Sequence, residues 1–137
     1  MLGDQIGEGR GKRTARRVLS TQPQLKVEVS FEDTAKLLGV EGVYIGTYVS
    51  MTRPDGSLDA EGQGVFAAPD GDIVTWKGIG TGRFGAAGAV SYRGCLTYNT
   101  ASPELSRLKH NRGHFRVRSR RQRKHVFQNL GVEVDAG

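Results

Sequence analysis

The segment YIGTYVSMTRPDGSLDAEGQGVFAAPDGDIVTWKG, residues 44–78, contains two copies of the turn sequence Pro-Asp-Gly. The stretches RPDGS at 53–57 and APDGD at 68–72 each predict a type I turn followed by a glycine in the left-handed conformation. Such turns pair the residues that flank them, which are Arg53 with Ser57 and Ala68 with Asp72. Each turn therefore predicts a β-hairpin, and together they predict a three-stranded antiparallel sheet.

Counting outward from the two turns assigns the residues of this sheet to its two faces. Gly64 is predicted opposite Gly46 from the first turn and opposite Trp76 from the second, so the two independent registers agree. One face has no charged side chain, and we predict that it is the interior; its members are Tyr44, Gly46, Tyr48, Leu58, Ala60, Gly62, Gly64, Phe66, Val74, Trp76, Gly78, Gly80, Gly82 and Phe84. The other face mixes charged and apolar residues and is expected to be half-solvated.

Glycine recurs with a period of two elsewhere in the chain, in GEGRG at 7–11 and KGIGTG at 77–82. This spacing disfavours helix, places the glycines of a strand on one face and is typical of tightly curved strands. Further strands are predicted at 5–18, 25–31 and 90–98 from alternating residue types. We therefore predict an all-β protein, an antiparallel up-and-down β-barrel.

One helix is predicted, near residues 103–110. The sequence SPEL at 102–105 supplies Ser102 as the N-cap, Pro103 in the first turn and Glu104 near the positive end of the helix dipole. We place this short helix between the last predicted strand of the barrel and the C-terminal part of the chain.

A resemblance to known proteins is carried by EGQGVFAAPDGDIVTWKGIGTGRF at 61–84 and AVSYRGCLTYNTASPELSRL at 89–108. These runs resemble a group of uncharacterised bacterial single-domain proteins whose architecture is similar to the allene oxide cyclase and dirigent type of β-barrel. The resemblance covers about residues 4–108 and implies a barrel of the calycin or allene oxide cyclase-like kind. It also implies binding of small hydrophobic molecules, and in some cases their cyclisation, although a fold does not define a function.

The basic character of the chain is confined to its C-terminal part. Residues 1–106 hold 11 Lys/Arg against 12 Asp/Glu, whereas residues 107–137 hold 9 Lys/Arg against 2 Asp/Glu. We therefore expect two regions, a β-barrel domain at 1–108 and an irregular basic tail at 109–137. The high net charge of +6 says little about the barrel domain, which is close to neutral.

Three interpretations of the basic tail remain open. The stretch RGHFRVRSRRQRKH at 112–125 has the composition of an arm that binds nucleic-acid phosphates without reading sequence. It also fits a solvated, disordered extension, because blocks of like charge repel each other. The third interpretation is a frame-shifted end: read one nucleotide later, synonymous codons from His114 onward can spell IFEFEVDDNGNTFSKTWEWK and then a stop. That string alternates like a strand, carries a turn and resembles the final hairpin of the group named above.

Cysteine and histidine usage limits the chemistry of the barrel domain. Cys95 is the single cysteine, so an intramolecular disulfide and a cysteine-based metal site are excluded. The histidines are His110, His114 and His125, all in the tail, which excludes a histidine-based catalytic site in the barrel. No metal or cofactor is predicted. No apolar run approaches the roughly 18 residues that span a bilayer, so we expect no membrane partner and a cytoplasmic location.

Two sets of residues are candidates for a functional site. The ligand-binding candidates are the aromatic residues of the predicted interior: Tyr44, Tyr48, Phe66, Trp76, Tyr92 and Tyr98. Rings opposite glycine form flat-walled slots that suit a planar or polyene-like molecule, although the same rings would also form an ordinary core. The catalytic candidates are Glu61 and Lys77, which require the predicted interior to be inverted, and Arg93, which would anchor a carboxylate or enolate inside a barrel.

These observations favour a small apolar-ligand-binding β-barrel protein. The first alternative is a cyclase or isomerase that confines and orients a hydrophobic substrate. The second is nonspecific nucleic-acid binding through the Arg-rich tail. The expected partner is a small hydrophobic molecule rather than nucleic acid, and a homo-oligomer remains open.

The frame-shift hypothesis predicts the nucleotide sequence of the gene. Codons 109–134 should spell the alternating string one base along, with a stop after its final lysine. Sequencing the gene checks this, and codons that do not spell the string would eliminate the hypothesis.

Overall fold

The structure is a computed structural model that describes residues 5–86, 89–103, 112–119 and 124–131, with side chains described at 9–86 and 89–103. The described residues form strands without any α-helix. The strands are β1 (Gln5–Ser20), β2 (Lys26–Leu37), β3 (Val40–Thr52), β4 (Leu58–Ala67), β5 (Ile73–Phe84), β6 (Val90–Thr100), β7 (Arg112–Ser119) and β8 (Lys124–Gly131). The predicted helix near 103–110 falls almost entirely outside the described residues.

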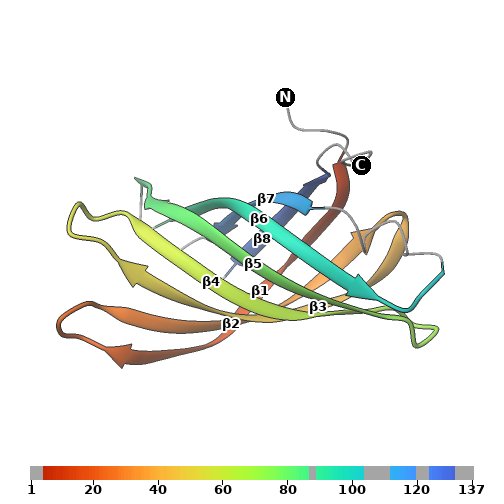
Figure 1. The fold of residues 1–137 in the computed structure, drawn as a ribbon, viewed down its shortest axis with the longest axis horizontal. Coiled ribbons are helices and arrows are strands. Elements are labelled where there is room, and N and C mark those ends of the chain that lie inside the picture. Colours follow the sequence, from red (N-terminus) through yellow and green to blue (C-terminus); the bar gives the residue numbers. More distant parts are fainter. Residues whose placement is uncertain (1–4, 87–88, 104–111, 120–123, 132–137) are drawn as a thin grey trace.

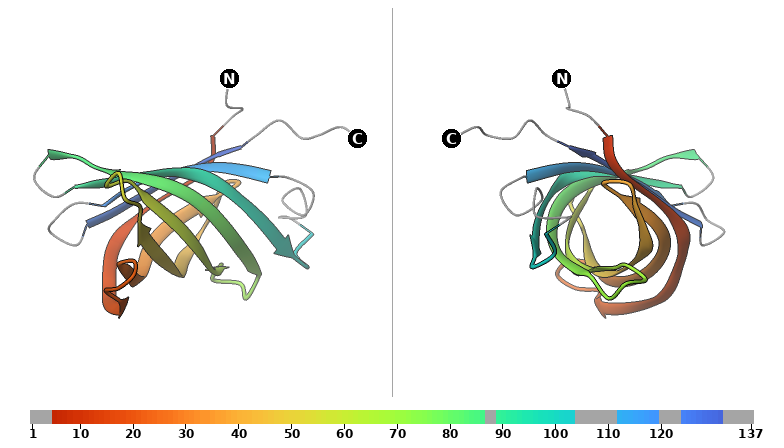
Figure 2. Two further views of the ribbon diagram at one scale, coloured as in Figure 1. Left: turned by 60° about the vertical axis from the view of Figure 1, so that its left-hand side comes forward. Right: turned by 90° about the vertical axis from the view of Figure 1, so that its right-hand side faces the viewer.

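Strands β1 to β6 form one antiparallel sheet in which each strand pairs with the next (Figure 1). In the strand order β6 and β1 are not neighbours, so these six strands do not close on themselves. The backbones of β7 and β8 lie between β6 and β1 and pair with both, which completes the strand order of a closed barrel (Figure 2). The expectation of an irregular tail was therefore wrong for residues 112–119 and 124–131. Pairing supplies the backbone hydrogen bonds that the exposed edges of β1 and β6 would otherwise lack.

Both predicted turns are confirmed. The Arg53 amide donates to the Ser57 carbonyl at 2.8 Å, and the Ala68 amide donates to the Asp72 carbonyl at 2.9 Å. The glycines that follow them have φ of 87° at Gly56 and 94° at Gly71, the left-handed region that favours glycine.

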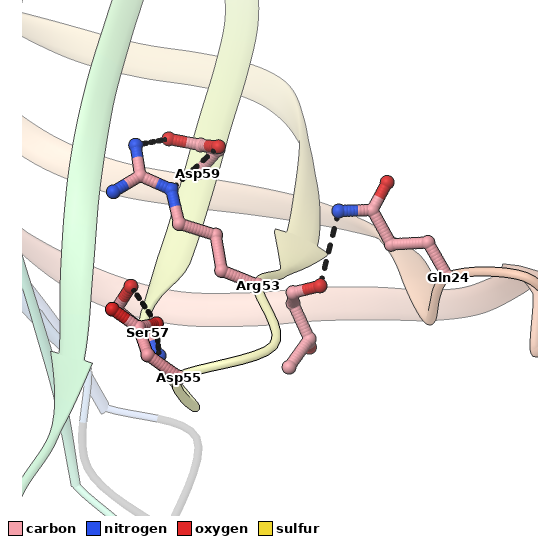
Figure 3. Close-up of polar contacts among 6 residues, drawn as sticks. Gln24, Arg53, Asp55, Ser57 and Asp59 are labelled. Carbon is pink, nitrogen blue, oxygen red and sulfur yellow. Dashed lines mark hydrogen bonds and ion pairs between the residues drawn. The ribbon is translucent and has the colours of Figure 1, made fainter.

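Side chains support the first of these turns (Figure 3). The Arg53 guanidinium forms an ion pair with Asp59, and the Ser57 amide donates to the Asp55 carboxylate at 2.9 Å. The hydrogen bond from Arg53 lowers the pKa of Asp59, and the hydrogen bonds from Ser57 lower the pKa of Asp55. Both carboxylates are therefore charged at neutral pH and hold the turn in place.

The predicted register and interior face are also confirmed. Gly46 pairs with Gly64, which pairs with Trp76. Most residues of the uncharged face are buried or half-buried, and Phe66 has no exposed surface, whereas the outward-facing Ile79 is 63% exposed. Phe84 is the exception among the predicted interior residues, at 61% exposure, because β5 ends there and no further residue of the strand covers it.

Aromatic rings lie directly on the glycines of the interior. A Cβ placed on Gly46 would lie 2.7 Å from the Phe31 ring and would also collide with Trp76. A Cβ on Gly64 would lie 2.7 Å from Trp76 Cζ2. Real Cβ atoms do not approach so closely, so these rings need glycine beneath them. The flat-walled slots predicted opposite glycine are filled at these two positions by the protein's own rings.

No helix in the described part of the chain has the length and apolar character needed to cross a membrane.

The ring contacts predict that Gly46→Ala destabilises the fold. The added methyl group must displace Phe31 or Trp76, and overpacking of this kind costs about 1–3 kcal/mol. Urea unfolding followed by the fluorescence of Trp76 measures the effect. Gly85→Ala is the matched control, because a Cβ there would meet only an ordinary contact at 3.8 Å. Equal stability of the two variants would contradict the assignment of the rings.

Candidate functional site

Two hydrogen bonds cross the interior from β3 to β6. The Oη atoms of Tyr44 and Tyr98 lie 2.9 Å apart, and the Tyr92 hydroxyl donates to Ser50 Oγ at 3.2 Å. In the sheet, β4 and β5 separate β3 from β6, so both contacts run across the curled sheet rather than along it. They place tyrosine hydroxyl groups inside an otherwise aromatic interior.

Trp76 lies at the centre of the aromatic cluster. Its ring is stacked on Phe31 with centroids 6.1 Å apart, and it is tilted against Tyr44 at the same centroid distance. Tyr44 in turn contacts Phe66 at 5.4 Å. The indole Nε1–H of Trp76 is buried and has no hydrogen-bond partner among the described residues. Buried Trp N–H groups usually have a partner, so this donor requires an explanation.

The interior tyrosines remain neutral over the physiological range. Burial raises the pKa of Tyr44 far above its ordinary value, and burial raises the pKa of Tyr98 well above 10.0 in the same way. Burial also raises the pKa of Tyr92. The three hydroxyl groups therefore act as neutral hydrogen-bonding groups.

A second group of polar side chains lies in the same interior. Arg13 of β1 is half-buried and pairs with Phe31, a residue of the core. The positive charge of Arg13 lowers the pKa of Tyr92 and opposes the larger effect of burial. Because β1 and β6 are not neighbours in the sheet, this interaction also runs through the interior. The ring of Tyr48 meets that of Tyr92 edge-on, with centroids 5.6 Å apart.

Asp33 is a fully buried carboxyl group of the interior, with no exposed surface. In the sheet it lies opposite Tyr44 on one side and Gly11 on the other. A Cβ on Gly11 would lie 2.5 Å from Asp33 Oδ1, so the carboxyl group lies directly over this glycine. The charge of Asp33 also contributes to the raised pKa of Tyr44. The interior thus holds an acidic group beside the tyrosine pair.

The structure brings together the six predicted ligand-binding residues and separates them from the predicted catalytic ones. Five of the aromatic residues are buried and one is half-buried, all on the interior face: Tyr44, Phe66, Trp76, Tyr92, Tyr98 and the half-buried Tyr48. Glu61, Lys77 and Arg93 are exposed on the outer face. Glu61 and Lys77 line an open hollow of about 770 Å³, and Glu61 and Arg93 line an adjoining one of about 440 Å³. The inverted interior is therefore wrong, and the catalytic role of these three residues stays a prediction without support from the interior.

Arg13, Asp33 and Ser50 were missed by the sequence analysis. For Asp33 and Arg13 the sequence held a signal. The alternation of 25–31, continued by one step, predicts an inward position for Asp33, and the period-two glycines of 7–11, continued by one step, predict an inward position for Arg13. Both were passed over because charged residues are expected on the outside of a barrel domain.

The described side chains do not include a residue group of the kind that binds metal ions. No group of three or more His, Cys, Asp or Glu side chains is placed there to hold a metal ion. Cys95 is exposed on the outer face.

Comparisons with known proteins support the fold. No family model matches the chain, and no curated protein matches it in sequence. Among solved structures, a protein of unknown function from Clostridium acetobutylicum has a TM-score of 0.83 at 11% identity, covering 95% of each chain. A β-barrel-like protein from Acinetobacter baumannii has a TM-score of 0.81 at 11% identity, covering 97% of this chain and 96% of its own. An enzyme from Penicillium herquei has a TM-score of 0.65 at 12% identity, covering 93% and 92%.

These likenesses define the class of the protein as an all-β, β-barrel-like fold. The Clostridium acetobutylicum structure is of a protein of unknown function and the Acinetobacter baumannii one of a β-barrel-like protein, and identities this low carry the fold alone. The finer kinship with allene oxide cyclases stays a prediction.

The buried tyrosines predict a loss of stability at alkaline pH. Their folded-state pKa values lie above the ordinary 10.0, so tyrosines of the unfolded chain ionise first as the pH rises. The stabilisation is complete below about pH 10 and is lost as the pH rises towards the folded-state values. Unfolding free energies measured from about pH 9 to 11.5 should therefore fall, and Tyr98→Phe should make the fall shallower.

Tyrosinate absorbance supplies the control for this prediction. In denaturant all tyrosines should titrate near pH 10, whereas Tyr44, Tyr92 and Tyr98 should remain protonated there in the folded protein. Identical titrations of the folded and unfolded chains would refute the burial of these hydroxyl groups.

Proposed function

We propose that the protein binds a small, mainly apolar molecule inside the barrel. The residues proposed to contact it are those of the aromatic interior: Tyr44, Tyr48, Phe66, Trp76, Tyr92 and Tyr98. The observation that carries the proposal is the buried Trp76 Nε1–H, which has no partner among the described residues. An acceptor atom on a bound molecule would satisfy this donor.

The surroundings of Trp76 suit a flat molecule. Rings from different strands face one another at centroid distances of 5.4 to 6.2 Å, which supports contact with an aromatic or conjugated ligand. Ligand pockets combine such apolar walls with a few well-placed polar groups, and here the tyrosine hydroxyls fill that role. A cytoplasmic location is part of the same proposal.

An enzyme of cyclase or isomerase type is the second candidate. The observation that favours it is the fully buried Asp33 beside the Tyr44–Tyr98 hydroxyl pair, a carboxyl group close to neutral hydrogen-bonding groups. Such a combination serves acid–base chemistry on a confined substrate. The likeness to the Penicillium herquei enzyme supports a shared fold, not a shared reaction.

Nonspecific binding of nucleic acid rests on the charge of the tail alone. Backbone strands at 112–119 and 124–131 place these segments in the sheet rather than in an extended arm. The ligand-binding proposal is therefore preferred.

The role of Trp76 is tested with two ligands that differ in one acceptor. The protein should bind 2-acetylnaphthalene, which has a carbonyl oxygen, about threefold to tenfold more tightly than 2-ethylnaphthalene. Trp76→Phe keeps most of the ring contacts and removes the N–H, so it should abolish this preference. Calorimetry measures both affinities in each protein.

Two controls make the outcome specific. The single tryptophan reports binding by its fluorescence, so a ligand in the interior should change the emission of Trp76. Phe84→Leu removes an exposed ring and should change neither affinity nor emission. Absence of saturable binding by both naphthalenes, or binding that leaves Trp76 emission unchanged, would reject the proposal.

A further inference from the structure

We propose that the interior contains a carboxylate-binding subsite formed by Arg13, Tyr48, Ser50 and Tyr92. The ligand would then be an amphipathic acid, with its apolar part against the aromatic cluster and its carboxylate against Arg13. This inference rests on the proposed function and names the class of ligand for the same interior.

The geometry of the subsite comes from three strands that meet across the interior. Ser50 and Tyr48 lie on β3, Tyr92 on β6 and Arg13 on β1. The Tyr92 hydroxyl is fixed by its hydrogen bond to Ser50 Oγ at 3.2 Å, and the Tyr48 ring supports the Tyr92 ring edge-on. Phe31, the sheet partner of Arg13, lies with its ring centroid 6.2 Å from that of Tyr48, so the guanidinium group and the three hydroxyl groups belong to the same part of the barrel.

Burial indicates which part of the interior reaches solvent. Around the Tyr44–Tyr98 hydroxyl pair, Tyr44 and the neighbouring Phe66 are 1% and 0% exposed, so that part is closed. Arg13, Tyr48 and Ser50 also face inward but keep partial exposure. A ligand would reach the subsite from this side without opening the closed part.

The chemistry of these groups matches a carboxylate. The guanidinium is planar, always charged and presents its N–H groups in a fork that fits two carboxylate oxygens. The Ser50 hydroxyl accepts from Tyr92 and keeps its own O–H, a neutral donor that would hold the same oxygens. The effect of Arg13 on the pKa of Tyr92 supports their closeness inside the barrel.

A purely structural role for Arg13 makes a different prediction. Asp33 lies at the adjacent inward position on β2, next to Phe31, the partner of Arg13. If Arg13 served only to balance this buried carboxyl group, its replacement would lower stability without changing ligand preference. Ligand preference is therefore the readout that separates the two roles.

The test compares 2-naphthoate with its neutral methyl ester on the full-length chain. Calorimetry should show that the protein binds the acid at least about tenfold more tightly than the ester. Arg13→Gln should remove this preference, Arg13→Lys should retain part of it because the charge remains, and Tyr92→Phe should reduce it. Arg10→Gln is the matched control, because Arg10 lies on the same strand but is exposed, and it should leave the ratio unchanged.

Each outcome separates the subsite from the proposed function. If the acid binds no more tightly than the ester, or if Arg13→Gln lowers the melting temperature and leaves the ratio unchanged, the subsite is wrong. In that case saturable binding of 2-acetylnaphthalene would still uphold an apolar ligand site. Should Arg13→Gln fail to fold, the ratio measured for Arg13→Lys and Tyr92→Phe decides, and an unchanged ratio in both overturns the subsite.

Discussion

Contact between aromatic rings and glycine backbones determines the cross-section of this barrel. Gly46 and Gly64 lie under the ring of Trp76, and a methyl group at either position would collide with it. Interiors are close-packed, so the rings and the curvature of the strands depend on each other. The same closeness lets side chains of β3 and β6 meet across the curled sheet, although two strands separate them in sequence order. The site therefore follows from the contact that builds the core.

The interior also buries polar groups, which must be hydrogen-bonded to be tolerated. Two of the bonds across the interior provide this, between Tyr44 and Tyr98 and between Tyr92 and Ser50. Because these bonds join side chains rather than backbone, they can exchange one partner for a ligand without breaking the sheet. The buried N–H of Trp76 differs, because it has no hydrogen-bond partner among the described residues. In the proposed function, an acceptor atom of the ligand satisfies this N–H.

Local sequence signals predicted the centre of the barrel well. Turn chemistry at 53–57 and 68–72 defines the register of three strands, because turn type and strand pairing are short-range properties. The strands at 112–119 and 124–131 were missed because their pairing with β6 and β1 is long-range and their arginine content is typical of a solvated tail. Arg13 was missed for a related reason: alternation placed it inside, but its charge argued for the outside. The rings that fill the predicted slots at Gly46 and Gly64 could not be foreseen, because a glycine in the sequence does not reveal which ring will cover it.

Stability alone does not explain the charged groups of the interior. Removing an ion from water costs several kcal/mol, and apolar residues of similar volume are often at least as stabilising in a core. Asp33 and Arg13 nevertheless face inward on β2 and β1, next to Phe31 of the aromatic core. When a protein keeps ionisable groups in an apolar interior, those groups are often found at functional sites. Asp33 lies in the closed part of the interior, and Arg13 lies in the part that reaches solvent. The two ends of the interior therefore differ, so a ligand with one polar end would bind in one orientation.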